Sequence, residues 1–342
     1  MIFDACDLEF PILKQQLPAE KLLSGFDPKN WFILEMAPIE ILEDLFFIER
    51  GYLNANHFVY RSPNPVLIDT AYIGDIEETE HRINALGVDL ADTCRIISTH
   101  SHCDHIGANK YIQDKSGCDI AIHKIGKHFI DTHDDWATWS KYYNQDAEFF
   151  NVTHALNDGD IIEVGPHRFQ VIYTPGHASD GIALFNEDAK ILISSDSLWE
   201  NDVPAMTLRI EGSAALFRAQ DSLEKIQALE ARIVYPGHGK PFTTVSDAIA
   251  KSQKKIQTYL KNREDTGLDL IKRISIYTLL MHKGFDQNLF FEHLMQTYWY
   301  KETVEFYFNG DYRGMYDRVM ADFISRGIVK SKNGKLVTTV KP

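Results

Sequence analysis

The sequence is poor in cysteine, and no two of its cysteines have metal-binding or redox spacing. Only 4 of the 342 residues are cysteine, without a C-x-x-C pair, so we expect reduced thiols. The chain also lacks the run of about 18 apolar residues that a membrane span needs, and its first residues are acidic where a secretory leader would be basic. These absences predict a cytoplasmic protein with no membrane contact.

Three common catalytic signatures are missing as well. The chain contains no G-x-S-x-G, no G-x-x-x-x-G-K-[ST] and no G-x-G-x-x-G. These patterns would have indicated, in turn, a serine nucleophile, a phosphate-binding loop and a dinucleotide fold. Covalent catalysis through a serine is therefore not expected.

Positive charge is in the minority. The chain has 35 Lys and Arg against 49 Asp and Glu, for a net charge of −14, which disfavours long, unspecific contact with a polyanion. Residues 267–342 are the exception, because Lys and Arg outnumber Asp and Glu there by eleven to eight. The carboxyl-terminal part is mildly basic and the rest strongly acidic.

What the chain does have is a dense group of metal-ligand side chains in Thr99–His105, T-H-S-H-C-D-H. Imidazole and carboxylate suit zinc, iron or manganese. In an extended segment, side chains two positions apart project to the same side, so His100 and His102 can share one metal. Asp104 and His105 then face a second ion. The run predicts a hydrolytic site with two metals.

Three more candidate ligands each follow a short apolar run that closes in a turn. They are His177 in Y-T-P-G-H, Asp196 in S-S-D and His238 in Y-P-G-H-G. Short apolar runs bounded by Gly, Pro and Ser are typical of buried strands. With the run before the first group, the sequence predicts four strands that deliver ligands at their carboxyl ends, where the backbone is rigid. Glycines such as Gly237 are expected to make room beside the metal.

With these motifs, the sequence resembles the metallo-β-lactamase superfamily over roughly residues 30–262. The family pattern of H-x-H-x-D-H, a later His, an Asp and a final His is matched in order. The resemblance implies an α/β fold, a four-layer αββα sandwich with the site along one edge of two sheets. Alternating strand-like and helix-like segments, such as the helix-like residues 107–116, agree with this layering.

The resemblance also implies how the ligands divide between two ions. The implied sets are His100, His102 and His177 for one metal, Asp104, His105 and His238 for the other, and Asp196 as the bridge. The implied cofactors are two divalent metal ions, with zinc favoured and iron or manganese as alternatives. Two ions about 3.5–4 Å apart can share a hydroxide and polarise the oxygen of the group under attack.

Two carboxylates are candidate catalytic residues. Asp69, after V-L-I, resembles the family's aspartate that orients the ligand loop, with a strand-end cap as the alternative interpretation. The leaving group needs a proton, and either Asp104 released from its ion or a metal-bound water can supply it. The sequence does not separate these two sources.

Aromatic residues between the first and second ligand groups are candidates for a substrate wall. Trp136 and Trp139 lie in this insertion and predict a lid or apolar wall beside the metals, with a helix face packed on the core as the alternative. Trp199 and Asn201 directly follow the strand of the bridging aspartate. We expect them at the rim of the site.

We expect two domains, a catalytic domain over residues 1–265 and a winged-helix-like domain over residues 266–342. Residues 1–29 form an amino-terminal extension without a motif. The second domain is predicted from helix-like segments at residues 268–282, 288–298 and 312–326 and a hairpin at residues 327–340. Such a module grips nucleic acid in one interpretation. Its weak charge favours the other, a packing module that shapes the substrate entrance or a homodimer contact.

The leading functional hypothesis is a metal-dependent hydrolase that uses a metal-bridging hydroxide on a small carboxylic ester, lactone or thioester. The first alternative is a phosphodiesterase or ribonuclease whose carboxyl-terminal domain holds RNA. The second is a sulfur dioxygenase with a single iron near His100, His102 and His177, because such enzymes share the H-x-H-x-D-H loop. A small-molecule substrate is the favoured partner.

Overall fold

The structure is a computed structural model that describes residues 37–342. The extension expected at residues 1–29 and Cys6 lie outside the described residues, whereas Cys94, Cys103 and Cys118 are free thiols, as expected. None of the helices in the described part has the length and apolarity to cross a bilayer.

Two mixed β-sheets form the centre of the described chain. The first has the strand order β1-β2-β3-β4-β5-β6-β7 and the second β12-β11-β10-β9-β8. The strands are β1 Ile39–Leu42, β2 Leu45–Ile48, β3 His57–Tyr60, β4 Val66–Ile68, β5 Arg95–Ile97, β6 Asp119–His123, β7 His154–Leu156, β8 Ile161–Val164, β9 His167–Tyr173, β10 Ile182–Asn186, β11 Ile191–Ser195 and β12 Ile233–Pro236. Strands β4 to β7 run parallel, as do β11 and β12, so ligand-bearing turns can gather at one edge of each sheet.

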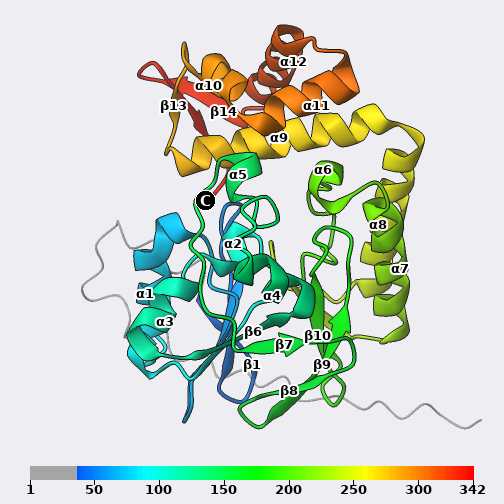
Figure 1. Cartoon of the computed structure of the whole chain (residues 1–342). Helices are drawn as coiled ribbons and strands as arrows, with labels where there is room; N and C mark the ends of the chain where they lie inside the picture. Colours follow the sequence, from blue (N-terminus) through cyan, green and yellow to red (C-terminus); the bar gives the residue numbers. More distant parts are fainter. Residues whose placement is uncertain (1–36) are drawn as a thin grey trace, which may run out of the picture. The chain divides into compact units, whose positions relative to one another are not determined.

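Helices cover the outer faces of both sheets (Figure 1). They are α1 Ile76–Asn84, α3 Asn109–Ser116 and α4 Lys124–Asp131 on the first sheet and α7 Ala215–Ala228 and α8 Val245–Lys261 on the second. The one-turn helices are α2 Cys103–Ile106, α5 Ser140–Tyr143 and α6 Leu208–Glu211, and η3 Ile73–Asp75 and η4 Leu90–Asp92 are short 3-10 turns. Ile83 of α1 and Ile112 of α3 pack on the first sheet, whereas Leu223 of α7 and Ile256 of α8 pack on the second. Together with the sheets they make the expected αββα sandwich.

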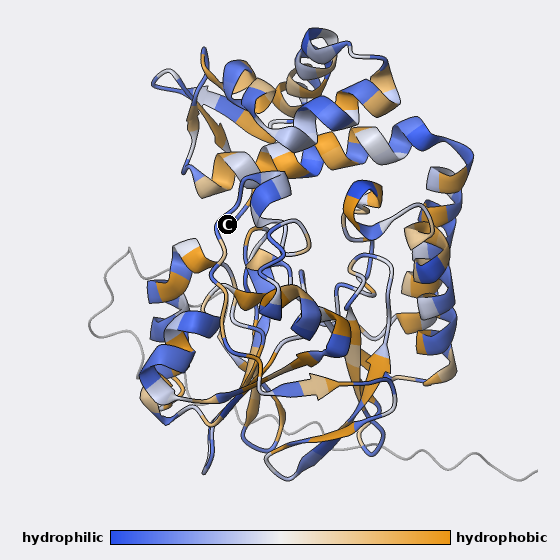
Figure 2. Cartoon of the chain, viewed as in Figure 1, coloured by the Kyte–Doolittle hydropathy of each residue, from blue (hydrophilic) through white to orange (hydrophobic). Residues whose placement is uncertain are grey.

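The core between the sheets follows from strand patterning. Phe47 and Phe58 of the first sheet lie against Tyr235 of the second, with ring centroids 5.3 and 6.3 Å apart. Full burial of such a side chain is worth about 1.5–3 kcal/mol. Strand β10 is buried along its whole length, as expected for a central strand with neighbours on both faces. Helix α8 instead alternates apolar and polar stripes (Figure 2), which fits a helix with one face on the sheet.

Beyond the sandwich, the chain continues into four helices and a small antiparallel sheet. The elements are α9 Arg263–Met281, β13 Phe285–Asp286, α10 Phe290–Gln296, α11 Tyr298–Phe308, α12 Tyr312–Ser325, β14 Val329–Lys332 and β15 Lys335–Thr338. The expected hairpin is present, because β14 pairs with β15 across Asn333 and Gly334, both of which have positive φ. Helix α11 was not expected from the sequence. The boundary expected after residue 265 falls inside α9, and the division into two domains stays a prediction.

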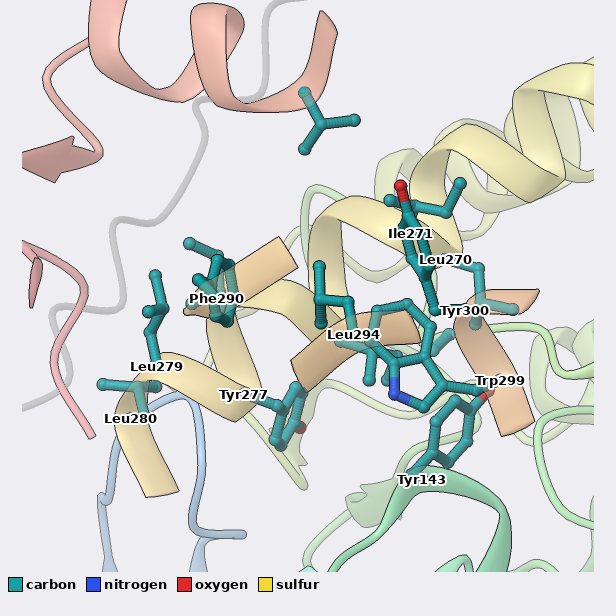
Figure 3. Close-up of a cluster of buried hydrophobic side chains, with 14 of the residues drawn as sticks. Tyr143, Leu270, Ile271, Tyr277, Leu279, Leu280, Phe290, Leu294, Trp299 and Tyr300 are labelled. Carbon is teal, nitrogen blue, oxygen red and sulfur yellow. The ribbon is translucent and has the colours of Figure 1, made fainter. Parts of the chain in front are cut away.

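These carboxyl-terminal helices share a hydrophobic cluster with the sandwich. Figure 3 shows Leu270 and Ile271 of α9 beside Trp299 and Tyr300 of α11, with Tyr143 of α5 below them. Both α11 aromatics are fully buried. The apolar face of α9 is thereby held against the part of the chain that follows the first ligand group.

We predict that Gly107→Ala destabilises the fold. A Cβ at this position would lie 2.2 Å from the backbone nitrogen of Ile73 and 2.5 Å from the carbonyl oxygen of Ala71, and backbone atoms cannot move aside as a flexible side chain can. Overpacking of this kind typically costs about 1–3 kcal/mol, which urea unfolding measures. Gly74→Ala is the control, since its nearest neighbours are ring atoms of Tyr72, at 3.0 Å or more. An unchanged unfolding midpoint for Gly107→Ala would contradict the prediction.

Candidate metal centre

Every sequence-predicted ligand lies just beyond the carboxyl end of a strand. The group from His100 to His105 follows β5 and runs into the one-turn helix α2, whereas His177 follows β9. Asp196 comes directly after β11, and His238 is the second residue after β12. Because these strand ends lie at one edge of the sandwich, segments more than 130 residues apart meet there.

The structure brings the seven side chains together. Ligand atoms within 4.8 Å of one another form three overlapping groups, which are His100, His102 and His177; His100, His105 and Asp196; and Asp104, His105 and His238. All seven residues are at least nine-tenths buried. The first and third groups are the two ligand sets expected from the sequence.

Asp196 lies between these two groups. Its Oδ2 atom is 3.3 Å from Nε2 of His177, 3.6 Å from Nε2 of His105 and 3.8 Å from Nε2 of His238. Its Oδ1 atom accepts a hydrogen bond of 3.2 Å from the indole of Trp199. One carboxylate oxygen therefore faces imidazoles of both groups, as a bridging ligand requires.

The outward-facing ring nitrogens are held by fixed acceptors. Nδ1 of His105 lies 2.8 Å from Oδ2 of Asp69, and Nδ1 of His177 donates to the carbonyl oxygen of Ala205 at 2.8 Å. Nδ1 of His238 donates to the carbonyl oxygen of Gly51 at 3.1 Å. Such outer bonds fix the tautomer of a histidine and orient its other nitrogen toward a metal.

Asp69 does more than end a strand. Its carboxylate accepts hydrogen bonds from the backbone N–H of Thr99 at 2.8 Å and from the Thr99 hydroxyl at 2.7 Å, in addition to its contact with His105. It lies beyond β4, next to the strand that leads into the ligand group. This geometry suits the expected role of orienting the ligand loop.

Sequence reasoning missed Glu211, which faces His102 at ion-pair distance without a hydrogen bond to it. Nδ1 of His102 points inward, 3.0 Å from Nε2 of His177, and its outer Nε2 is 3.7 Å from Oε1 of Glu211. Burial raises the pKa of Glu211 to about 8, although a hydrogen bond from Ser179 works in the opposite direction. Glu211 belongs to the short helix α6 and no motif surrounds it, so nothing in the sequence marked it.

Burial and neighbouring charges shift the pKa values of the histidines at this centre. Desolvation, followed by the neighbouring imidazoles, holds the pKa of His100 and of His102 well below the usual histidine range. Burial also opposes charge on His105, but Asp69 and Asp196 outweigh it and raise its pKa well above that range. His100 and His102 are therefore held neutral, which is the form that binds a cation, whereas His105 must release a proton when it binds one.

The donor set fits divalent metal ions. Nε2 of His100, His105 and His238 and Oδ1 of Asp104 are buried without a hydrogen-bond partner, although buried polar atoms normally have one. These four atoms belong to residues of the three ligand groups. A cation shared by them would satisfy atoms that the protein leaves unpaired.

Two of the four expected substrate residues lie at this centre. Trp139 stacks on the ring of His102, with centroids 3.7 Å apart and planes 23° apart, and Trp199 contacts both Asp196 and the ring of His238. Trp136 instead packs on Tyr142, Tyr298 and Arg209. Asn201 is exposed and accepts a hydrogen bond from Lys251. The described contacts of these last two residues do not reach the ligand groups.

Gly237 leaves room for the bridging carboxylate. A Cβ there would lie 2.1 Å from Oδ1 of Asp196 and 3.1 Å from Cε1 of His105. Any side chain at this position would therefore displace two candidate ligands at once, which is why the turn before His238 carries a glycine.

Comparison with known proteins identifies the family of this chain. The family model of the metallo-beta-lactamase superfamily matches residues 58–238, which include all seven candidate ligands and more than half of the chain. The chain belongs to this superfamily and is a metal-dependent hydrolase, and its histidine and aspartate cluster implies divalent metal ions.

Individual relatives are distant. A probable metallo-hydrolase of Bacillus subtilis (strain 168) is 27% identical over 201 residues, which cover 50% of this chain but only 62% of that relative. A hydroxyacylglutathione hydrolase of Nitrobacter winogradskyi is 27% identical over 207 residues, or 60% of this chain and 72% of that protein. The crystal structure of a metallo-beta-lactamase family protein from Thermus thermophilus superimposes with a TM-score of 0.56 at 19% identity, covering 87% of this chain and all of that one. This last likeness bears on the fold alone.

We predict that Glu211→Ala weakens binding of the ion facing His102. The outer partner of a metal-ligating histidine is typically worth about 10–100-fold in metal affinity. The loss should be confined to one of two binding steps in a titration of metal-free protein against a chromophoric chelator. Glu224→Ala, an exposed position on α7, should leave both steps unchanged. Equal affinities for the Glu211→Ala variant and the wild type would refute the assignment.

Proposed function

We propose that this hydrolase uses two divalent metal ions, zinc being favoured, to cleave a small carboxylic ester, lactone or thioester. His100, His102 and His177 would hold one ion. Asp104, His105 and His238 would hold the second, and Asp196 would bridge them. When bound, such a pair of ions activates a water molecule and polarises the oxygen of the group under attack.

The observation that carries the proposal is the single carboxylate oxygen of Asp196 that faces histidines of both groups at 3.3 to 3.8 Å. A centre with one metal ion would not need a carboxylate between the two groups, because each group beside Asp196 already has three donors. The outer hydrogen bonds that the histidines donate to Asp69 and to backbone carbonyls hold the ligands in place before substrate arrives. Pre-positioned donors of this kind lower the reorganisation that catalysis needs.

Trp139 and Trp199 support a small, largely uncharged substrate. They lie against His102 and His238 respectively, one beside each proposed ion. The cation behind Trp199, Arg273, is already paired with Asp202 at 2.7 Å and Asp269 at 2.5 Å. Trp139 is buried, so the partly exposed Trp199 and the neutralised arginine behind it are what favour an acyl group over a phosphate. The names of relatives such as the hydroxyacylglutathione hydrolase point in the same direction.

Asp104 remains the protein group proposed to return a proton to the leaving group. Its Oδ2 is 3.2 Å from Nε2 of His238, and its Oδ1 lacks a partner. Burial opposes charge on Asp104, but the neighbouring imidazoles outweigh burial and lower its pKa, so the carboxylate is ionised and able to accept a proton. It can then deliver that proton within the same dry site.

The ribonuclease alternative rests on three lysines of the β14–β15 hairpin. Lys330, Lys332 and Lys335 are all exposed on β14 and β15, where they either contact RNA or protect a sheet edge from pairing. Replacing all three with alanine would remove RNA binding at low salt if this function holds. Unchanged binding, or none in the wild type, would dismiss it.

We predict that chelation abolishes ester, lactone or thioester turnover and that two equivalents of divalent metal restore it. His102→Ala should lower kcat/KM by orders of magnitude, because it removes a donor from the first group, with little change in the unfolding midpoint. His128→Ala is the matched control, since this histidine of α4 lies outside the ligand groups.

Elemental analysis accompanies this assay. Metal-loaded protein inert to a broad panel of all three substrate classes would reject the proposed reaction. About one iron per chain together with oxygen uptake would instead favour the sulfur dioxygenase.

A further inference from the structure

Helix α9 reaches the metal centre through one hydroxyl group. Tyr277 is almost fully buried, and its hydroxyl donates to Oδ2 of Asp104 at 3.4 Å. The same Oδ2 faces Nε2 of His238 at 3.2 Å. Figure 3 shows Tyr277 farther along α9 than Leu270 and Ile271, within the same buried cluster. The helix thus anchors itself in the carboxyl-terminal cluster and presents Tyr277 to the centre.

The same helix also contacts the bridging carboxylate of Asp196 indirectly, through Trp199. Arg273, one turn before Tyr277, lies with its guanidinium 5.8 Å from the ring of Trp199, and Trp199 donates to Asp196. The ring of Tyr52 packs on Tyr277 with centroids 5.0 Å apart. Tyr52 thus packs directly on the ring of Tyr277, and Arg273 and Trp199 connect the same helix to Asp196.

The chemistry of the contact suits a metal ligand. A hydroxyl is a neutral donor, so it fixes the rotamer of a carboxylate without cancelling its charge, whereas a lysine at this position would compete with a cation. Oδ1 of Asp104 has no hydrogen-bond partner. With Oδ2 restrained by Tyr277, Oδ1 stays available to an ion, and outer contacts of this kind tune metal affinity.

We propose that Tyr277 is a positioning residue for Asp104, so that the carboxyl-terminal helices complete the subsite of the second metal ion. This inference rests on the ligand sets proposed above. It gives the region after the sandwich a role in metal binding that its weak charge and its packing do not reveal.

The test is a stepwise metal titration of full-length Tyr277→Phe, freed of metal by a chelator, with Co²⁺ or Zn²⁺. The affinity for one ion should fall by about 10–100-fold, and the affinity for the other should match the wild type. The comparison between the two steps within one protein separates positioning from a general loss of stability, which would weaken both. Equal affinities for both ions in variant and wild type would overturn the proposal.

Tyr52→Phe is the matched control. It removes a hydroxyl from the same pair of packed rings, without a described hydrogen bond to Asp104, so both binding steps should keep their wild-type affinities. An equal loss in Tyr52→Phe would show that removal of a buried hydroxyl with no bond to Asp104 has the same effect, which would also overturn the proposal.

A measurement on the unsubstituted protein keeps the proposal testable if Tyr277→Phe does not fold. Binding of an ion to Asp104 changes the acceptor of the Tyr277 hydroxyl, so one of the two metal equivalents should produce a tyrosine difference spectrum in the ultraviolet. No such change on either equivalent would overturn the inference alone. A wild type that takes up fewer than two ions would overturn the two-metal function together with it.

Discussion

The structure depends on placing seven ionisable side chains where water cannot solvate them. Histidines and aspartates are rarely buried without partners, and here each candidate ligand is buried in the edge of a sandwich. Hydrogen bonds from the outward-facing ring nitrogens to the carboxylate of Asp69 and to the carbonyl oxygens of Ala205 and Gly51 offset part of this desolvation cost. The protein leaves inner atoms of His100, Asp104, His105 and His238 unpaired. A cation is what makes this arrangement favourable, and the two sheets are the frame that keeps it from relaxing.

The parts of this arrangement that were predictable are local in sequence. Short apolar runs ending in Gly, Pro or Ser indicated the strands before His177, Asp196 and His238, and strands β9, β11 and β12 are found there. The Asn-Gly pair indicated the β14–β15 hairpin because a two-residue turn has strict conformational demands. Helix α11 escaped notice because aromatic residues occur on several of its faces, so it shows no clear apolar stripe.

The supporting contacts were not predictable, because they join segments that have no common pattern. Glu211 meets His102 across more than 100 residues, and Tyr277 meets Asp104 across 173. Each is an ordinary residue in an ordinary helix, and only the packing of that helix brings it to the centre. The same reasoning separates Trp139 from Trp136. They are three residues apart in one insertion, yet only Trp139, which has a positive φ, turns its ring onto a candidate ligand.

Helix α9 changes how the boundary of the catalytic region is understood. Sequence composition divides the chain near residue 265, where the acidic part gives way to a mildly basic one. The helix instead runs through that point without a break, and residues along it contact two sets of neighbours. Leu270 and Ile274 bury it in the carboxyl-terminal cluster, while Arg273 and Tyr277 lie over Trp199 and Asp104. Because one helix carries both sets, the carboxyl-terminal cluster and the contact with Asp104 depend on the same element of the fold.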